Sequence, residues 1–340
     1  MSDKAKKRWA AVFAAGAIFL LTAMGCGGSS GGGEAGLTYE GNREEAEITA
    51  DNAQVLAASA YDSSAIEGPF GAFSSLTDSG STSVGIHGRP AMLAVSQALE
   101  TALLKADPGA VAATVAARAA VTLSDTVSGA CGGNASFTIQ ADDSSGAFSG
   151  SFSFNSYCED ETTIDGQASF SGRIDPDTEV LDYFSFSFSS LSGSGGGESF
   201  RLNGRISVSV DADYDRTVLT MDMLFEEPAT DETLWLRDFR ISVTERAAYE
   251  EIDFSGRIYH PVHGYVDILT LTVFRVYDGD DYPSQGAFRL TGADNGKVLM
   301  TALSNLQYQV QADVDGDDDY EWGPETYDWE DDDGGAGLQD

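Results

Sequence analysis

The chain has 340 residues, of which 55 are acidic and 19 basic, so its formal net charge at pH 7 is −36. Such a surface repels phosphate backbones, which excludes nucleic acid as an expected partner. A divalent cation or a basic protein is the charged partner that this composition favours, although adaptation to high salt also produces an acidic surface. The length is sufficient for a large core in one or two domains.

The N-terminus has the order of an export signal. Four basic residues (Lys4, Lys6, Lys7 and Arg8) precede an apolar run from Trp9 to Met24. That run is shorter than the about 20 residues that a membrane-spanning helix needs. A charged segment followed by a short apolar one is typical of a secretory signal. We therefore expect residues 1–25 to be a signal peptide.

The end of this run, Ala23-Met24-Gly25-Cys26, resembles the lipobox of bacterial lipoproteins, with Ala23 in place of the usual leucine. The resemblance implies cleavage before Cys26, a diacylglycerol on its sulfur, and an acyl chain such as palmitate on its freed amine. Because Gly27 rather than aspartate follows the cysteine, the sorting rule of that family implies the outer membrane, at its periplasmic face or at the cell surface. An ordinary signal peptide with an incidental cysteine is the alternative.

A flexible tether is expected after Cys26. Residues 27–33 are almost wholly glycine and serine, and the ten residues 27–36 should have a mean reach of about 17 Å as a random coil. We assign residues 26–47 to the lipidated cysteine and this tether. Loss of residues 1–25 leaves a mature chain with 54 acidic and 15 basic residues, of which only Lys105 and Lys297 are lysines.

Residues 48–122 are predicted to be a small helical segment that packs on the rest of the protein. Thr49 is a suitable N-cap for a helix over residues 50–60. Pro90 is suited to the first turn of a second helix, which would continue over residues 91–104. A further alanine-rich helix is predicted over residues 110–120.

From residue 123 to residue 322 the sequence alternates with a period of two. Phenylalanines alternate with serines over residues 148–154 and 184–189, which is typical of antiparallel strands with one face in water. The fold class is therefore mainly β: a long antiparallel meander that forms a curved sheet, a half-barrel or a barrel. The run from Val266 to Phe274 is apolar on both faces, so we expect it to lie under other structure.

Two cysteines fit one hairpin in this region. A turn at Ser144-Ser145 pairs Cys131 with Cys158 and Phe137 with Phe152, with all four side chains on one face. An exported protein folds in an oxidising compartment, so we expect a disulfide between Cys131 and Cys158. Two free buried thiols are the alternative.

A short motif recurs three times, as Phe170-Ser-Gly-Arg-Ile174, Leu202-Asn-Gly-Arg-Ile206 and Phe254-Ser-Gly-Arg-Ile258. Glycine inside a strand allows a bulge or bend, so the motif predicts points at which the sheet curls. We expect the arginines to form an outward row that pairs with acidic neighbours, or else to line an anion site.

The best candidate for chemistry is an acidic run near the C-terminus, formed by Asp313, Asp315, Asp317, Asp319 and Glu321. Calcium takes six to eight oxygen ligands, which closely spaced aspartates on a turning backbone supply. The opening Asp-Val-Asp-Gly-Asp resembles calcium loops of the Asp-x-Asp-x-Asp class, including the dockerin type. Asp318 stands where the sixth residue is usually glycine, and Pro324 where the twelfth carries a closing carboxylate. A solvated acidic turn is the alternative, and an acidic tail is expected over residues 323–340.

Other chemistry has little support in the sequence. His260 and His263 flank a predicted turn but lack a cysteine or an obvious third ligand for zinc, so we expect them to line the turn. Outside the Gly/Ser-rich run over residues 27–33, no Gly-x-Ser-x-Gly sequence of a nucleophile elbow is present, nor is a phosphate-binding glycine loop. We therefore expect that the protein is not an enzyme.

These observations predict a monomeric, non-enzymatic envelope lipoprotein with a structural or binding role. One alternative is a periplasmic carrier whose β trough holds an apolar ligand against Phe184, Phe186 and Phe188. Another is a calcium-dependent surface adhesion protein. The Thr-x-x-Asn-Ala helix start, the two-cysteine hairpin, the meander and the Asp-rich end resemble uncharacterised proteobacterial envelope lipoproteins, a likeness that implies no activity.

Overall fold

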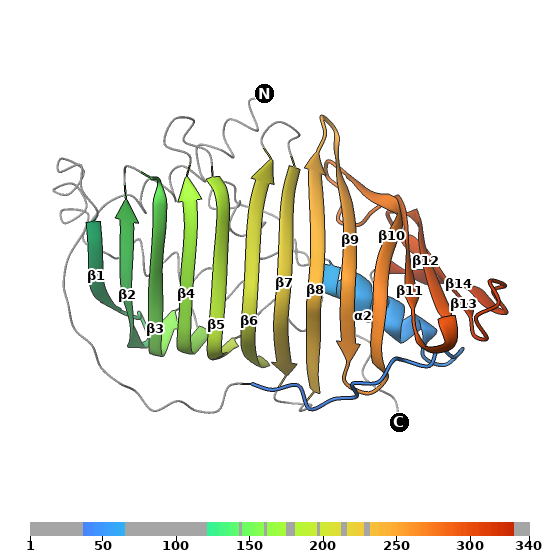
Figure 1. Ribbon diagram of the computed structural model, residues 1–340, viewed down its shortest axis with the longest axis horizontal. Helices are drawn as coiled ribbons and strands as arrows, with labels where there is room; N and C mark the ends of the chain where they lie inside the picture. Colours follow the sequence, from blue (N-terminus) through green and yellow to red (C-terminus); the bar gives the residue numbers. More distant parts are fainter. Residues whose placement is uncertain are drawn as a thin grey trace.

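The computed structural model describes residues 37–64, 121–142, 145–159, 162–174, 181–195, 198–211, 216–227 and 232–329. Fourteen strands in this part of the chain form one antiparallel sheet, in which each strand pairs with the next along the sequence. Figure 1 shows them side by side in chain order. The first and last strands are not paired with each other, so the predicted antiparallel meander is confirmed as an open sheet rather than a closed barrel.

The strands are β1 (Val121–Ser128), β2 (Gly132–Asp142), β3 (Ala147–Glu159), β4 (Thr162–Ile174), β5 (Leu181–Gly195), β6 (Glu198–Asp211), β7 (Arg216–Glu227), β8 (Glu232–Glu245), β9 (Tyr249–His260), β10 (Gly264–Tyr277), β11 (Gln285–Thr291), β12 (Lys297–Ser304), β13 (Gln307–Asp313) and β14 (Trp322–Asp328). The described residues also contain the helix α2 (Ala53–Ser64) and a short 3-10 turn, η1 (Ala293–Asn295). The last strand takes up residues that the sequence assigned to the acidic tail. The predicted helices over residues 91–104 and 110–120 lie outside the described residues.

One face of the sheet, the inner face, is apolar. Phe137, Phe152, Phe170 and Phe186 are 2–5% exposed on successive strands from β2 to β5. The ring centroids of neighbours in this row are 5.6–5.8 Å apart. Aromatic pairs in this range add about 0.5–1.5 kcal/mol each beyond the burial itself. The helix α2 belongs to the same hydrophobic core and contacts β9, β12 and β13.

The opposite, outer face carries the small polar residues of the alternating pattern. Ser149, Ser151 and Ser153 are exposed on β3, while Phe152, between two of these serines, and Phe154, after the last, are buried. The prediction of antiparallel strands with one face in water is therefore confirmed for this part of the sheet.

The β2–β3 hairpin has the predicted pairing over most of its length. Phe137 faces Phe152 and Ala135 faces Phe154, and the register shifts by one residue between Gly132 and Asn134. The sulfurs of Cys131 and Cys158 are bonded, with the two Cα atoms 5.1 Å apart. The shift offsets the cysteines by one position from the simple register, because Cys158 faces Gly132.

Residues 37–48 form an extended segment, the strap, which runs along the lower edge of the sheet in Figure 1 and leads to α2. The side chain of Asn203 on β6 donates a hydrogen bond to the carbonyl of Leu37 at 3.2 Å. Further along, the strap exchanges backbone hydrogen bonds with Tyr265 at the start of β10. The strap therefore joins strands that lie far apart in the sheet.

The helix starts with the predicted cap, although its regular part begins at Ala53 rather than at residue 50. The hydroxyl of Thr49 accepts a hydrogen bond from the backbone N–H of Asn52 at 3.3 Å. In return, the side-chain oxygen of Asn52 accepts one from the N–H of Thr49 at 2.9 Å. This reciprocal pair satisfies donors that a helix start leaves unpaired.

Two of the three motif glycines produce the predicted backbone distortion. Gly204 and Gly256 have φ of +130° and +136°, and a Cβ at Gly256 would lie 2.6 Å from the Cα of Phe239. Gly172 differs, because its φ is not positive and the ring of Phe148 packs over it instead.

The arginines of the motif are directed outward, as predicted. Arg173 pairs with Asp182 at 3.4 Å and Arg257 with Asp267 at 2.7 Å. Arg205 instead donates a hydrogen bond to Ser187 at 3.3 Å.

The expectation that Val266 to Phe274 lies under other structure is wrong for one side of β10. Leu269, Leu271 and Val273 are 47%, 50% and 37% exposed. The cause is a bulge: between the pairs Val266–Ile258 and Phe274–Ile252, seven residues of β10 face five of β9. The extra residues make this part of β10 arch out of the sheet.

Candidate functional site

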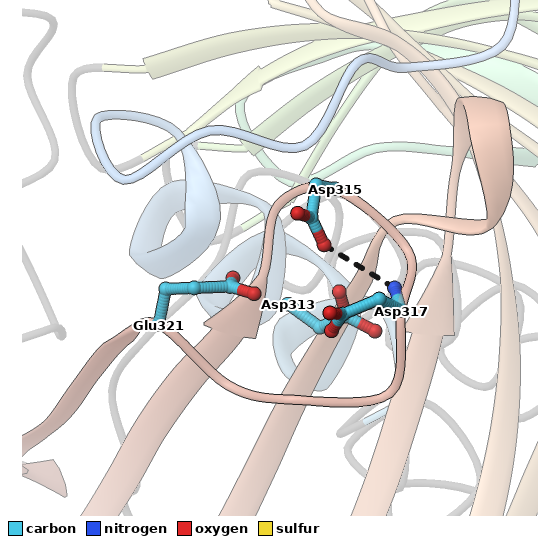
Figure 2. A group of neighbouring side chains, drawn as sticks. All are labelled: Asp313, Asp315, Asp317 and Glu321. Carbon is cyan, nitrogen blue, oxygen red and sulfur yellow. Dashed lines mark hydrogen bonds between the residues drawn. The ribbon is translucent and has the colours of Figure 1, made fainter.

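The acidic run forms the loop between β13 and β14. Asp313 is the last residue of β13, and β14 begins at Trp322. Figure 2 shows the side chains of Asp313, Asp315, Asp317 and Glu321 turned toward one another inside this loop. Each offers one carboxylate oxygen, and these four oxygens lie within 4.8 Å of one another. The group could therefore hold a metal ion.

Hydrogen bonds to the Asp313 carboxylate shape the loop. One of its oxygens accepts the N–H of Gly316 at 2.7 Å, and the other accepts the N–H of Asp318 at 3.0 Å. At the far end, the carboxylate of Glu321 accepts the N–H of Val314 at 3.0 Å. These bonds wind the backbone around Asp313 and bring the next acidic side chains back over it.

The loop is also fixed to its neighbour, the turn between β11 and β12. The side chain of Asn295 donates a hydrogen bond to the carbonyl of Gly316 at 3.0 Å. Gly316 has φ of +77°, and a Cβ there would lie 2.3 Å from the carbonyl oxygen of Asp294. Only glycine allows this close approach without strain.

A buried lysine lies beneath the loop. Lys297 at the start of β12 is 5% exposed and Asp313 is 0% exposed. The Lys297 Nζ lies 2.9 Å from Asp313 Oδ2 and 2.9 Å from Asp318 Oδ1. Hydrogen bonds to Asp318 and Asp313 raise the pKa of Lys297. The buried carboxylate is therefore neutralised by a positive charge from a neighbouring strand.

The two innermost aspartates differ in their electrostatics. Burial works to raise the pKa of Asp313, but hydrogen bonds from Lys297 and from the N–H groups of Asp318 and Gly316 outweigh it and hold the pKa below its usual value. The pKa of Asp315 is raised, through desolvation and through the charges of Asp317 and Glu321. A cation among these oxygens would relieve the repulsion around Asp315.

Two departures from the calcium-loop pattern have a structural answer. Asp318, at the position that is usually glycine, has φ of +74° and so adopts the backbone conformation that glycine favours there. Pro324 supplies no carboxylate at the twelfth position and lies in β14, but Glu321, three residues earlier, turns into the group instead.

One of the five predicted ligands is not part of this group. Asp319 lies outside the set of converging oxygens, and its N–H donates to the carboxylate of Asp317 at 2.9 Å. Sequence reasoning also missed Lys297 and Asn295. The available signal was that Lys297 is one of only two lysines after residue 25 and follows the Asp294-Asn-Gly296 turn.

The two histidines form a turn rather than an evident metal centre. His260 is 7% exposed, and its Nδ1 accepts the N–H groups of Val262 and His263 at 3.2 and 3.3 Å. Burial, with a smaller contribution from His263, lowers the pKa of His260 to about 4. Among the described residues, the acidic group is the only set of three or more histidine, cysteine, aspartate and glutamate side chains with metal-binding geometry.

The remaining candidate residues fall outside this region. Cys26 lies outside the described residues. Of the helices in the part of the chain that the structure describes, none has the length and apolar character needed to cross a membrane. No family model, curated protein or solved structure matches the chain. The function of the protein must therefore be inferred from the geometry of the acidic loop and from the N-terminal sequence.

Proposed function

We propose that this protein is a non-enzymatic lipoprotein of the bacterial envelope whose β13–β14 loop binds a calcium ion. The observation that carries the proposal is the convergence of the Asp313, Asp315, Asp317 and Glu321 carboxylates within 4.8 Å. Four carboxylate oxygens from a tightly wound loop are hard ligands, which suit calcium better than a softer metal. Water and backbone carbonyls would complete the six to eight ligands that calcium takes.

The buried lysine is compatible with this role. Asp313 Oδ2 is engaged by Lys297 and by the N–H of Asp318, whereas Oδ1 accepts the N–H of Gly316. A carboxylate oxygen has two acceptor positions, so Oδ1 can offer its second position to a cation. Lys297 then keeps the loop folded before the ion arrives, and calcium adds to a site that is already shaped.

The proposed attachment is a lipid on Cys26 at the outer membrane, and its support is the N-terminal sequence. A Cys26→Ser variant should no longer be cleaved before residue 26 and should no longer incorporate labelled palmitate, because the sulfur that takes the first lipid is gone. Gel mobility and metabolic labelling of cells that express either form measure the two effects. Normal processing and unchanged labelling of Cys26→Ser would contradict the anchor.

Calcium binding is tested on the mature chain by thermal unfolding and isothermal titration with calcium chloride, with magnesium chloride as the comparison. A ligand that binds only the native state adds about 2.7 kcal/mol when its concentration is 100 times Kd. We expect the melting temperature to rise with calcium and to respond much less to magnesium.

The variant Asp315→Asn/Asp317→Asn should abolish this response. A control with the same loss of charge is Asp238→Asn/Asp278→Asn, because both positions are exposed and lie outside the loop. A melting temperature that calcium leaves unchanged, or one that rises equally in both double variants, would refute the assignment.

The carrier alternative receives less support. It expects Phe184, Phe186 and Phe188 to line a cavity, but Phe186 and Phe188 are 5% and 3% exposed and stack on each other with centroids 5.7 Å apart. Packed rings of this kind favour a core. Native mass spectrometry of the purified protein distinguishes the two proposals, because a carrier should retain a lipid and the calcium protein an ion of 2+ charge.

A further inference from the structure

The outer face of β10 carries three exposed apolar side chains close together on one strand. We call it the β10 ridge: Leu269, Leu271 and Val273, which are 47%, 50% and 37% exposed. The sequence over Val266 to Phe274 is that of a strand covered on both sides. Apolar side chains that lie together on an exposed surface are candidates for burial against a partner.

The ridge is a built feature of the sheet. Seven residues of β10 face five of β9 at this point, so the ridge arches outward. The hydroxyl of Thr270 fixes the bulge, because it accepts the N–H of Phe254 at 2.9 Å and donates to the carbonyl of Phe254 at 3.0 Å. The side chain thereby replaces the backbone partner that the bulge removes, and the ridge is held in a defined shape.

The charges beside the ridge are of opposite sign at its two ends. Asp267 precedes it and is held by Arg257, with two hydrogen bonds of 2.7 and 2.9 Å. Arg275 follows it and is held by Glu251 at 3.1 Å. Ile268 and Phe274 are buried on the inner face, so their neighbours Asp267, Leu269, Val273 and Arg275 point outward. Leu271, between them, is 50% exposed. The outward order is therefore acid, three apolar residues, base.

This order is complementary to itself when reversed. If two such strands meet antiparallel about a two-fold axis at Leu271, Leu269 faces Val273 of the partner subunit. In the same arrangement Asp267 faces Arg275 of the partner subunit. An interface with two-fold symmetry requires a surface that complements its own copy in this way.

We propose that the β10 ridge is covered by a second copy of this chain in that antiparallel arrangement. The protein is then a dimer on the membrane rather than the monomer that the sequence led us to expect. The inference does not depend on calcium binding, because the ridge and the β13–β14 loop are separate surfaces. Because residues 26–340 contain 54 acidic and 15 basic residues, two copies repel each other, and screening by salt should strengthen the association.

Cysteine cross-linking in membranes of expressing cells tests the arrangement on the full chain. Leu271 lies on the axis, so Leu271→Cys should form a disulfide-linked dimer under mild oxidation. Leu306→Cys is the matched control, since Leu306 is 63% exposed on the turn between β12 and β13, away from the axis. We expect a dimer band on a non-reducing gel for Leu271→Cys and little for Leu306→Cys. Equal yields, or no dimer from Leu271→Cys, would overturn the proposal.

Charge reversal in the Leu271→Cys background examines the direction of pairing. Adding Asp267→Arg should lower the dimer yield at least about tenfold, because like charges then face each other across the interface. Adding Arg275→Asp as well should raise the yield again. In the double variant each exchanged charge also lies beside the like charge of Arg257 or Glu251 in its own chain, so a structural fault would become worse and the yield would not recover. If instead Leu271→Cys does not cross-link and is shielded from a membrane-impermeant thiol reagent, the ridge lies against the bilayer and the dimer is excluded.

Discussion

The β2–β3 hairpin and the β12–β13 pair each hold two side chains together at a strand end, by different means. Cys131 and Cys158 are joined covalently beside a row of buried phenylalanines. Lys297 and Asp313 are joined by charge, with Asp313 0% exposed and an acidic loop wound above it. The disulfide acts on the unfolded chain, because it reduces the number of conformations open to that chain. The ion pair acts on the folded chain, because each of the two buried charges would be costly without its partner.

The largest loss of unfolding free energy should come from removal of the Lys297 charge beneath the β13–β14 loop. Lys297→Met leaves the Asp313 carboxylate buried without its partner, which costs about 3–5 kcal/mol of unfolding free energy. Urea unfolding followed by tryptophan fluorescence, without added calcium, measures the loss. The double variant Lys297→Met/Asp313→Asn should lose less than Lys297→Met alone. A single variant that stays within about 1 kcal/mol of the parent would show that the pair is not what holds this region.

The Cys131–Cys158 disulfide should contribute slightly less to the unfolding free energy than the Lys297–Asp313 pair. Cys131→Ser/Cys158→Ser opens a loop with a sequence separation of 27 residues, which lowers stability by about 3–4 kcal/mol on the chain-entropy model. In equilibrium unfolding, the variant should have the same unfolding free energy as the parent measured with reductant. A clear difference between them would mean that the serines disturb the hairpin in some other way.

The two pairs also differ in how far the sequence predicts them. The hairpin pairing follows from alternation and one turn, both of which are local, and the shared face of Phe137 and Phe152 is predicted correctly from them. The convergence of four acidic side chains is likewise visible in their spacing. Lys297 was missed because it reaches Asp313 only through strand pairing.

Contacts between residues farther apart in the sequence were even harder to predict. The Tyr39 hydroxyl donates a hydrogen bond to the carbonyl of His260, 221 residues away in the sequence. No local sequence pattern predicts that the strap contacts this turn. The bulge of β10 depends on how many residues β9 offers opposite it. Strand patterns specify faces well, but the lengths of paired strands and the path of a covering segment are settled by the whole sheet.

His260 is a third kind of buried polar side chain, because its imidazole is buried in the neutral form and not as a charge. Because burial lowers the pKa of His260 from 6.5 to about 4, the unfolded chain takes up a proton at a higher pH than the folded one. The contribution of the neutral His260 to the unfolding free energy is fully present above pH 6.5 and falls as the pH drops toward 4. At 1.36 kcal/mol per pKa unit, the total loss is about 3 kcal/mol.

Urea unfolding at pH 7.5 and pH 4 measures this loss, and the difference between the parent and His260→Gln separates it from the titration of carboxylates. His263→Gln is the comparison, because His263 is less buried and its pKa is lowered by burial without the same hydrogen bonds. If the parent and His260→Gln lose the same stability between the two pH values, the turn does not depend on a neutral imidazole.

The smallest effect should come from the helix start, which is the most local of these interactions. Thr49→Ala removes the hydroxyl that accepts the Asn52 N–H at 3.3 Å and should cost about 1 kcal/mol, as helix caps commonly do. Thr49→Ser keeps the hydroxyl and should stay near the parent in urea unfolding. If both variants lose the same amount, the methyl group and not the cap is responsible. The helix would then depend on packing against β12 and β13, and not on the local sequence that predicts it.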